Sequence, residues 1–406
     1  MTEDHKLRNI SFAEHLMPKE EMLEIRTNKK SLMIGIPKED ERFENRICLV
    51  PDAVSVLVMN GHRVLVENDA GEGANFSNGD YVAAGAEIVY TADEVFKADI
   101  ILKVAPLSKE ERKKLKPKQI IMSSLHLASQ DKEYFMDLIR NKVTAVAFER
   151  IKDKSGAYPV IRSMSKIVGN TAVFIAAEFL SSPKYGVGKM FGGFPGIIPT
   201  EVVILGAGTI AENAARAAIG MGATVKVFDN SIYKLERLQN NLNNRIFTSI
   251  IQPKLLTEHL KTADVVIGAI HASNGLSPCV VTEEMVQQMK EGSIIVDLSI
   301  DQGGCFETSD FTTHKDPVVV KHGIPHYCVP NVASRVPNTA SFAFSNLFTP
   351  MMNKIAEAGG LEPFLNQDHS FGSGVYMYNG IITNRSVGNR FDLPYQDLRL
   401  LMAALG

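Results

Sequence analysis

The chain has 406 residues, with 43 lysine and arginine residues against 46 aspartate and glutamate residues, and a formal net charge of −3. With 45% hydrophobic and 22% charged residues, it has the composition of a soluble globular protein long enough for two or three domains. The near-neutral balance argues against nucleic acid as a partner, because nucleic-acid-binding proteins usually carry a basic excess.

The N-terminal segment, residues 1–30, mixes both signs of charge and lacks the apolar core of a signal peptide, so we expect a short helical extension. The apolar runs of the chain fall short of the 18 or more residues that a membrane-spanning helix needs. The cysteines show no CxxC pair and no zinc-type spacing: Cys48, Cys279, Cys305 and Cys328. We therefore predict no metal site, no membrane partner and a cytoplasmic, reducing location.

Apolar strand-like runs alternate with helical patterns through the first 150 residues. After an apolar run over residues 32–37, we expect strands at 63–67, 100–104, 119–123 and 143–148, and helices at 80–85 and 132–140. Strands separated by crossover helices predict a parallel sheet with helices on both faces.

A buried helix is expected over residues 165–179, followed by a glycine-rich link at 186–196. A second alternating unit then predicts strands at 201–205, 224–228, 265–269 and 293–298, and helices at 209–221 and 283–289. A last helix over 341–358 suggests that the chain returns to the first domain and closes a cleft between two domains.

The sequence EVVILGAGTIA, residues 201–211, runs from a β-branched strand into a GxGxxA turn and an alanine-rich helix. Gly206 allows the tight turn, Gly208 lets a pyrophosphate approach the backbone, and the small Ala211 lets the helix pack closely on the strand. The helix N-terminus offers free N–H groups to phosphates. We predict cofactor contacts from Gly206, Gly208, Thr209 and Ile210.

Asp229 ends the next expected strand, 23 residues beyond Gly206, where an acidic side chain accepts hydrogen bonds from the adenosine ribose. A carboxylate repels a 2′-phosphate, which favours NAD over NADP. Lys234 either reaches the ribose or lies on a helix surface. These patterns predict an α/β fold with a Rossmann-type NAD-binding domain over residues 161–337 and a second, Rossmann-like substrate domain over 1–160 and 338–406.

Several motifs resemble one family. They are IGIPKE at residues 34–39, ENRICLVP at 44–51, SLHLA at 124–128, GAGT at 206–209 and SIDQGGCFE at 299–307. Together they resemble alanine dehydrogenase, in the family that also holds the nucleotide-binding alpha subunit of proton-pumping transhydrogenase. The resemblance runs from about Met33 to about Thr349, and the tail after Leu361 has no counterpart that we can place.

The resemblance implies reversible oxidative deamination of L-alanine to pyruvate and ammonia with NAD, in a homo-oligomer that is usually a hexamer. It implies that Arg46 binds the substrate carboxylate, His126 is the acid and base, and Asp301 lies beside nicotinamide and substrate. Taken singly, these residues also fit a surface ion pair, a core histidine and a helix N-cap. The resemblance also assigns cofactor contacts to Ser165, Lys234, Ala269, Ile270, Ile300, Asn331 and Val332.

One position departs from the family pattern. Where the family reads LKVKEP, with a second lysine that helps hold the substrate, this chain has Ala105. Lys103, two residues away, either takes over substrate binding or is structural. The difference leaves open another small 2-amino or 2-oxo acid, a transhydrogenase-like NAD(H)-binding module, or a catalytically silent NAD-binding regulator.

Overall fold

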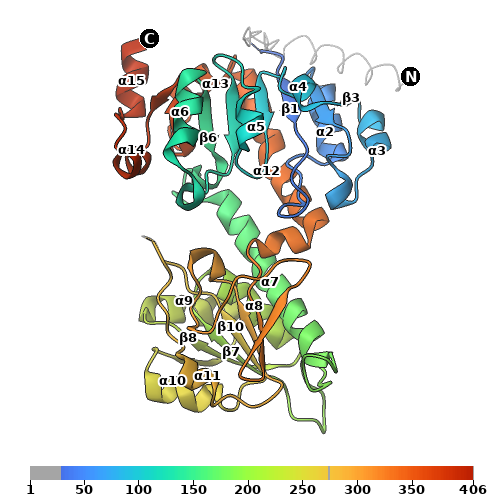
Figure 1. Cartoon of the computed structure of the whole chain (residues 1–406), viewed down its shortest axis with the longest axis vertical. Helices are drawn as coiled ribbons and strands as arrows, with labels where there is room; N and C mark the ends of the chain where they lie inside the picture. Colours follow the sequence, from blue (N-terminus) through green and yellow to red (C-terminus); the bar gives the residue numbers. More distant parts are fainter. Residues whose placement is uncertain (1–28, 273–274, 406) are drawn as a thin grey trace, which may run out of the picture.

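The computed structural model describes residues 29–272 and 275–405, which form two α/β lobes, one above the other in Figure 1. Each lobe is built on one mostly parallel sheet. This confirms the predicted two-domain α/β fold class. The helical extension predicted for residues 1–30 lies outside the described residues, apart from its last two.

The first lobe contains an eight-stranded sheet. Its order is β15 (Ile381–Ile382), β14 (Val375–Tyr378), β6 (Thr144–Ala147), β5 (Ile120–Ser123), β4 (Ile100–Leu102), β1 (Met33–Ile36), β2 (Arg63–Glu67) and β3 (Glu87–Val89). Strands β1 to β6 are parallel, whereas β14 runs antiparallel to β6, and β15 antiparallel to β14. Two strands from the C-terminal part of the chain therefore complete the sheet of the N-terminal lobe.

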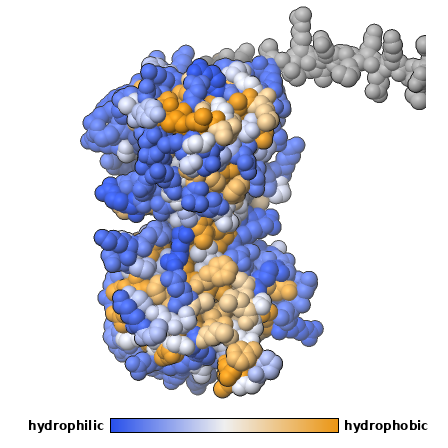
Figure 2. All heavy atoms as spheres, turned by 90° about the vertical axis from the view of Figure 1, so that its right-hand side faces the viewer, coloured by the Kyte–Doolittle hydropathy of each residue, from blue (hydrophilic) through white to orange (hydrophobic). Residues whose placement is uncertain are grey.

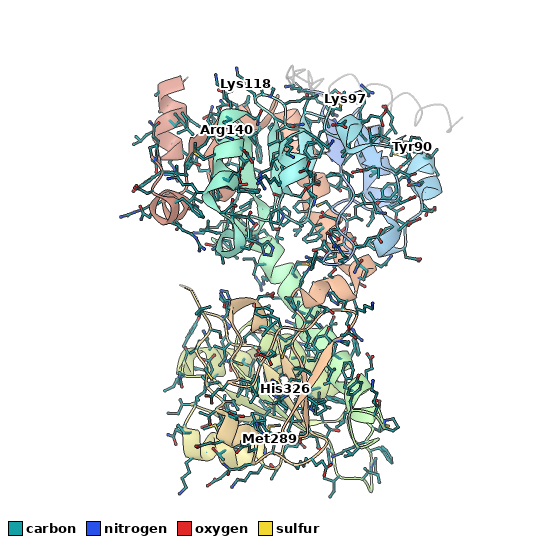
Figure 3. All side chains as sticks on the ribbon, in the orientation of Figure 1. Tyr90, Lys97, Lys118, Arg140, Met289 and His326 are labelled. Carbon is teal, nitrogen blue, oxygen red and sulfur yellow. The ribbon has the colours of Figure 1, made fainter. Side chains whose placement is uncertain are left out.

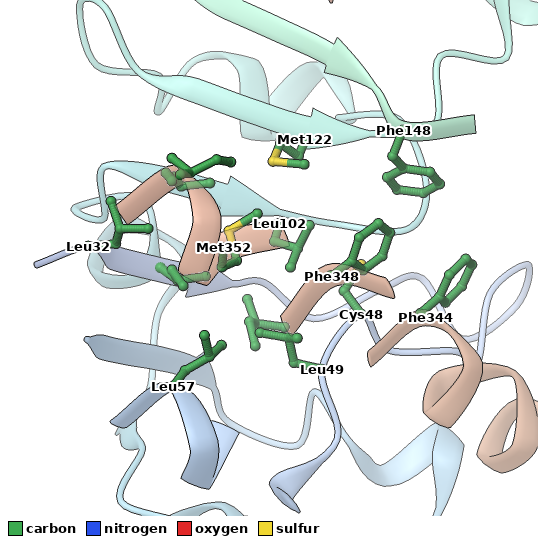
Figure 4. Close-up of a cluster of buried hydrophobic side chains, with 14 of the residues drawn as sticks. Leu32, Cys48, Leu49, Leu57, Leu102, Met122, Phe148, Phe344, Phe348 and Met352 are labelled. Carbon is green, nitrogen blue, oxygen red and sulfur yellow. The ribbon is translucent and has the colours of Figure 1, made fainter. Parts of the chain in front are cut away.

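The helices of this lobe come from both parts of the chain. They are α2 (Pro51–Met59), α3 (Asn78–Ala83), α4 (Ala92–Val95), α5 (Lys109–Arg112), α6 (Lys132–Arg140), α12 (Pro337–Glu357), α13 (Leu361–Gln367), α14 (Arg385–Phe391) and α15 (Leu398–Leu405). Figure 4 shows Phe344, Phe348 and Met352 of α12 among Leu49 and Leu102 in the core. The returning helix is thus part of the first hydrophobic core.

The second lobe contains a seven-stranded sheet. Its order is β12 (Val318–Lys321), β13 (Ile324–Tyr327), β11 (Ile294–Asp297), β10 (Val265–Gly268), β7 (Glu201–Leu205), β8 (Thr224–Phe228) and β9 (Phe247–Ser249). All neighbours are parallel except the β12–β13 hairpin. Its helices are α8 (Thr209–Gly220), α9 (Ile232–Leu242), α10 (Pro253–Leu260) and α11 (Glu283–Val286).

Helices α7 (Pro159–Ser181) and α12 lie where the chain passes between the lobes (Figure 1). Both begin with proline in the first turn, where its missing N–H costs nothing, and both begin a few residues before the predicted starts. Among the described residues, α7 is the one helix long and apolar enough to cross a membrane. It packs against α8, α12 and β11, as a core helix does.

Candidate active site

A cavity of about 290 Å³ lies between the lobes, and Figure 3 shows side chains of both lobes projecting into this region. The residues that line it include Arg46, Ser124, His126, Glu149, Ser165, Ile210, Leu298, Asp301, Asn331 and Val332. Arg46, His126 and Asp301, predicted from three distant motifs, therefore line one cavity. A larger cavity of about 630 Å³ between Leu365 and Ala403 is lined by none of the predicted site residues.

Arg46 is buried, and Glu44 fixes its guanidinium in a forked ion pair. Nη2 lies 2.5 Å from Glu44 Oε2, and Nε donates to Oε1 at 2.7 Å. The guanidinium lies over the Phe344 ring, 5.1 Å from its centroid, and Nη1 is 3.5 Å from Met164 Sδ. Two of the five N–H groups thus point to Glu44, which leaves others for a substrate carboxylate.

Asn331, which follows β13 in the chain, holds Glu44 in position. Its side-chain amide donates to Glu44 Oε2 at 2.8 Å, and its backbone is left-handed, with φ of 56°. Burial alone would raise the pKa of Glu44, but the adjacent Arg46 and the amide of Asn331 outweigh it and lower the pKa. The carboxylate that orients Arg46 therefore stays charged.

His126 follows β5 and also adopts a left-handed conformation, with φ of 41° and ψ of 53°. Its carbonyl accepts hydrogen bonds from the N–H and the hydroxyl of Ser129, both at 2.9 Å. Although the residue is exposed to the cleft, desolvation by the cleft walls and the charge of Arg46 lower the pKa of its imidazole, against a smaller opposite effect of Glu44. The neutral imidazole is thus favoured.

Glu149, which the sequence analysis missed, lies in the short 3-10 turn η3 (Phe148–Arg150) that follows β6, and lines the same cavity. Its Oε1 accepts the backbone N–H of Leu125 at 2.9 Å, whereas Oε2 is buried and has no hydrogen-bond partner within the described chain. Burial raises the pKa of this carboxyl group, and the N–H of Leu125 opposes the shift. The sequence did contain a signal for Glu149, because it directly follows the buried strand predicted at 143–148. The carboxyl ends of parallel strands meet at one edge of the sheet, where ligands bind.

Asp301 lies in the short 3-10 helix η4 (Ile300–Gln302), beyond the end of β11. Its alternative assignment as a helix N-cap is wrong, because the N-cap of this turn is Ser299. Burial in the cleft raises the pKa of Asp301, while the backbone N–H of Asn331 and the charge of Arg46 lower it. The side chain lines the cavity opposite the first lobe.

Lys103 is buried and does not line this cavity. Its ammonium group lies 2.8 Å from Glu39 and 3.5 Å from Glu111. Burial alone would lower the pKa of Lys103, but the two carboxylates raise it to about 12. The contacts favour the structural alternative for Lys103 over a contact with substrate.

The predicted glycine turn joins β7 to α8. Gly206 has φ of 106°, and a Cβ atom there would lie 2.4 Å from the carbonyl oxygen of Ala269. A Cβ atom on Gly208 would meet no atom within 4 Å. The open space beside Gly208, at the first turn of α8 with Thr209 and Ile210, fits a pyrophosphate group at a helix N-terminus.

Asp229 lies beside this turn, at the end of β8. Its Oδ2 accepts the N–H of Ala207, and its Oδ1 accepts the N–H of Ser231, both at 2.8 Å. Lys234 Nζ lies 3.9 Å from Asp229 Oδ2, so this lysine faces the carboxylate, and about half of its side chain is exposed. A carboxylate oxygen has two lone pairs, so Asp229 can still accept from a ribose hydroxyl.

The remaining predicted cofactor residues lie around the same edge of the sheet. Ser165 of α7 lines the cavity together with Asn331 and Val332, whereas Ile300 and Ala269 are buried and contribute none of its lining. The N–H of Ile270 donates to Ser299 Oγ at 3.0 Å. Within residues 29–272 and 275–405, no group of three His, Cys, Asp or Glu residues is arranged to hold a metal ion.

Two family models match this chain in succession. Residues 35–168 match the model "Alanine dehydrogenase/PNT, N-terminal domain", and residues 172–385 match "Alanine dehydrogenase/PNT, C-terminal domain". The chain belongs to the alanine dehydrogenase/PNT family. The match extends beyond Leu361, so the expectation that the tail has no counterpart is wrong up to residue 385. The tail supplies β14, which pairs with β6, and β15, which pairs with β14, and no local sequence pattern predicts the pairing of β14 with β6.

Two members of this family from staphylococci are similar to this chain over most of its length. An alanine dehydrogenase of Staphylococcus epidermidis is 38% identical over 368 residues, which is 90% of this chain and 99% of the relative. Alanine dehydrogenase 2 of Staphylococcus aureus is 37% identical over 90% of this chain and 98% of its own.

Solved structures of two kinds share the fold. An L-alanine dehydrogenase structure superposes with a TM-score of 0.83 and 34% identity, covering 89% of this chain and 99% of its own. A transhydrogenase from Sinorhizobium meliloti gives 0.75 at 22% identity, covering 86% and 99% of the two chains, which supports the fold alone.

Proposed function

We propose that this chain is an NAD-dependent alanine dehydrogenase, which converts L-alanine, NAD and water reversibly to pyruvate, ammonium, NADH and a proton. The observation that carries the proposal is that Arg46, His126 and Asp301 line one cavity at the carboxyl edges of two sheets. The relatives named above carry this activity in their names. Bound NAD would supply the acceptor for the hydride that leaves the substrate α-carbon.

The residues of the chain supply binding and proton transfer. Arg46 binds the substrate carboxylate and so fixes the α-carbon in the cleft. His126, whose lowered pKa keeps it neutral, accepts a proton from the substrate ammonium group, because only the neutral amine supports loss of hydride. In the second half of the reaction His126, after releasing this proton to solvent, takes a proton from the water that adds to the imine and returns it to the amino group. The amino group leaves as ammonia and takes up the hydroxyl proton, which gives pyruvate and ammonium. Asp301 stabilises the cationic imine electrostatically.

Among the described residues that line the cavity, Arg46 is the one lysine or arginine available for the substrate carboxylate, and Lys103 lies outside the cavity against two carboxylates. One guanidinium matches a ligand with one carboxylate, such as alanine or pyruvate. The alternative is another small 2-amino or 2-oxo acid of the same kind. The relatives and the cavity together favour alanine over a transhydrogenase-like module or a silent NAD-binding regulator.

A steady-state assay tests the proposal. NADH oxidation is followed with pyruvate and ammonium, next to a panel of small 2-oxo acids, and His126→Ala is the control. Turnover is expected with pyruvate above the other acids. A folded protein that binds NADH and turns over none of these acids would contradict the proposal.

We further propose a cytoplasmic homo-oligomer, by family a hexamer. Large apolar side chains are exposed over a short stretch of the second lobe: Phe174, Val187, Met190, Phe194, Ile197 and Ile198. Figure 2 shows hydrophobic surface on the lower lobe, on the side where α7 ends. Exposed apolar patches of this kind mark association surfaces. Light scattering coupled to size exclusion tests this, and a monomer would contradict it.

A further inference from the structure

The loop that carries Arg46 is held by serine hydroxyls from the returning part of the chain. Three backbone N–H groups of residues 45–50 donate to three serine Oγ atoms. The pairs are Asn45 with Ser334 at 2.8 Å, Ile47 with Ser341 at 2.9 Å, and Val50 with Ser345 at 2.9 Å. The three serines are almost fully buried.

The need for these hydroxyls follows from the backbone of the loop. Residues 44–50 belong to no helix or strand, and most of them are buried. A buried N–H group without a strand or helix partner must find another acceptor. Serines on η5 (Val332–Arg335) and on the buried face of α12 provide acceptors at fixed positions, since both elements pack against α7.

Arg46 lies between two of these fixed amides. Ser334 holds the residue before it and Ser341 holds the residue after it. The same segment supplies the Phe344 ring under the guanidinium and Asn331 against Glu44. Backbone, guanidinium and counterion of Arg46 are thus all positioned from residues 331–345.

We propose that Ser334 and Ser341 are positioning residues for Arg46. They fix the backbone on both sides of it, so that its free N–H groups face the substrate carboxylate in the cleft. They also attach the loop to the segment that contains Asn331 and Val332, which are predicted to contact the cofactor. The inference rests on the proposed function only in taking Arg46 as the carboxylate anchor.

The chain contains a matched control. Ser345→Ala removes the same kind of hydrogen bond from the same loop, at Val50, four residues beyond Arg46. Ser341→Ala and Ser345→Ala each leave one buried N–H without an acceptor, so both should lower the melting temperature to a similar extent. Only Ser341→Ala and Ser334→Ala should loosen Arg46.

The KM for pyruvate, at saturating NADH and ammonium, and the dissociation constant of oxamate from the NADH complex separate the two effects. Ser341→Ala and Ser334→Ala are expected to raise both constants by about fivefold or more, with kcat changed less than KM. Ser345→Ala should leave both within about twofold. Ser334→Ala serves as the second variant if Ser341→Ala does not fold.

The outcomes distinguish this inference from the proposed function. Normal turnover in the wild type, with equal constants for Ser341→Ala and Ser345→Ala, would overturn the inference and leave the function standing. Absence of turnover, with oxamate binding weakened by Ser341→Ala alone, would support the inference and remove the function. A wild-type NADH complex that binds no oxamate would overturn both.

Discussion

Glu149 accepts a hydrogen bond of 2.9 Å from the backbone N–H of Leu125, the residue directly before His126. The bond connects the end of β6 to the loop after β5, in which His126 takes its left-handed conformation. A carboxylate at the end of one strand thereby holds the loop of the predicted acid and base at the end of the next.

Replacement of Glu149 tests this relationship. Glu149→Ala leaves the N–H of Leu125 without an acceptor and frees the loop, so we expect kcat/KM to fall about 10-fold to 100-fold. Glu149→Gln keeps an acceptor oxygen and should stay within about fivefold of the wild type. Steady-state kinetics with pyruvate and ammonium measure both variants. Equal losses in the two would mean that the hydrogen bond to Leu125 is unimportant.

The protonation of His126 can be measured directly. Desolvation and Arg46 lower its pKa, so the imidazole should stay neutral to a pH below the ordinary value of about 6.5. Diethyl pyrocarbonate reacts with neutral imidazole, and the pH dependence of the inactivation rate should have its midpoint below about 6.5. The His126→Ala variant should have a kcat lower by about 10²-fold to 10⁴-fold. Its remaining activity should not fall further with the reagent, which identifies His126 as the reacting residue. A midpoint above that value would contradict the prediction.

Substitution by alanine should have different effects at the two glycines of the predicted cofactor turn, Gly206 and Gly208. Gly208→Ala meets no neighbouring atom, so its melting temperature should be unchanged, while the new methyl group occupies the pyrophosphate space and weakens NADH binding about tenfold or more. Gly206→Ala combines φ of 106° with a contact of 2.4 Å to Ala269, and should destabilise the fold by about 1–3 kcal/mol or more. Thermal unfolding and NADH fluorescence titration check the pair. Unimpaired NADH binding by Gly208→Ala would place the cofactor elsewhere.

Lys103 is expected to affect stability and not substrate binding. Lys103→Met leaves the buried carboxylate of Glu39 without its ammonium partner, which should cost about 3–5 kcal/mol of unfolding free energy. The KM for pyruvate should change by less than about threefold, because the ammonium group does not line the cavity. Urea denaturation and steady-state kinetics measure the two effects. A large rise in KM at unchanged stability would show that Lys103 binds substrate.

Asp229 should set the cofactor preference. Asp229→Asn keeps an acceptor oxygen for the N–H of Ala207 or Ser231 but removes the negative charge, so affinity for NADH should fall and the ratio of NADPH to NADH affinity should rise by about tenfold. Fluorescence titration with both nucleotides measures this ratio. An unchanged ratio would mean that Asp229 does not face the ribose.

Much of the fold could be predicted because the central strands are β-branched runs with clear ends. The strands predicted at 63–67, 201–205 and 224–228, and the helix at 132–140, agree with the structure residue for residue. The edge strands β3, β9 and β12 were missed, since they are short and mostly half-buried or exposed, without a strong apolar pattern. The pairing of β14 with β6 was missed because the two strands lie far apart in the sequence.

The site could be predicted only in part. Arg46, His126 and Asp301 lie in recognisable motifs, and the structure brings them to one cavity, although their roles stay predictions. The partners of these residues could not be predicted, because they come from distant segments. Glu39 lies 64 residues from Lys103, and Ser341 lies 294 residues from Ile47.

The completion of the first sheet by β14 and β15 constrains the order of folding during synthesis. The strands of the second lobe, from β7 to β12 and β13, are contiguous in the chain, so this lobe can become compact as soon as they have left the ribosome. The N-terminal lobe must wait for residues 337–382, with its α12 core face and the edge of β6 uncovered until then. The part of the protein made first is therefore finished last, because its core and sheet edge are completed only when α12, β14 and β15 have been synthesised.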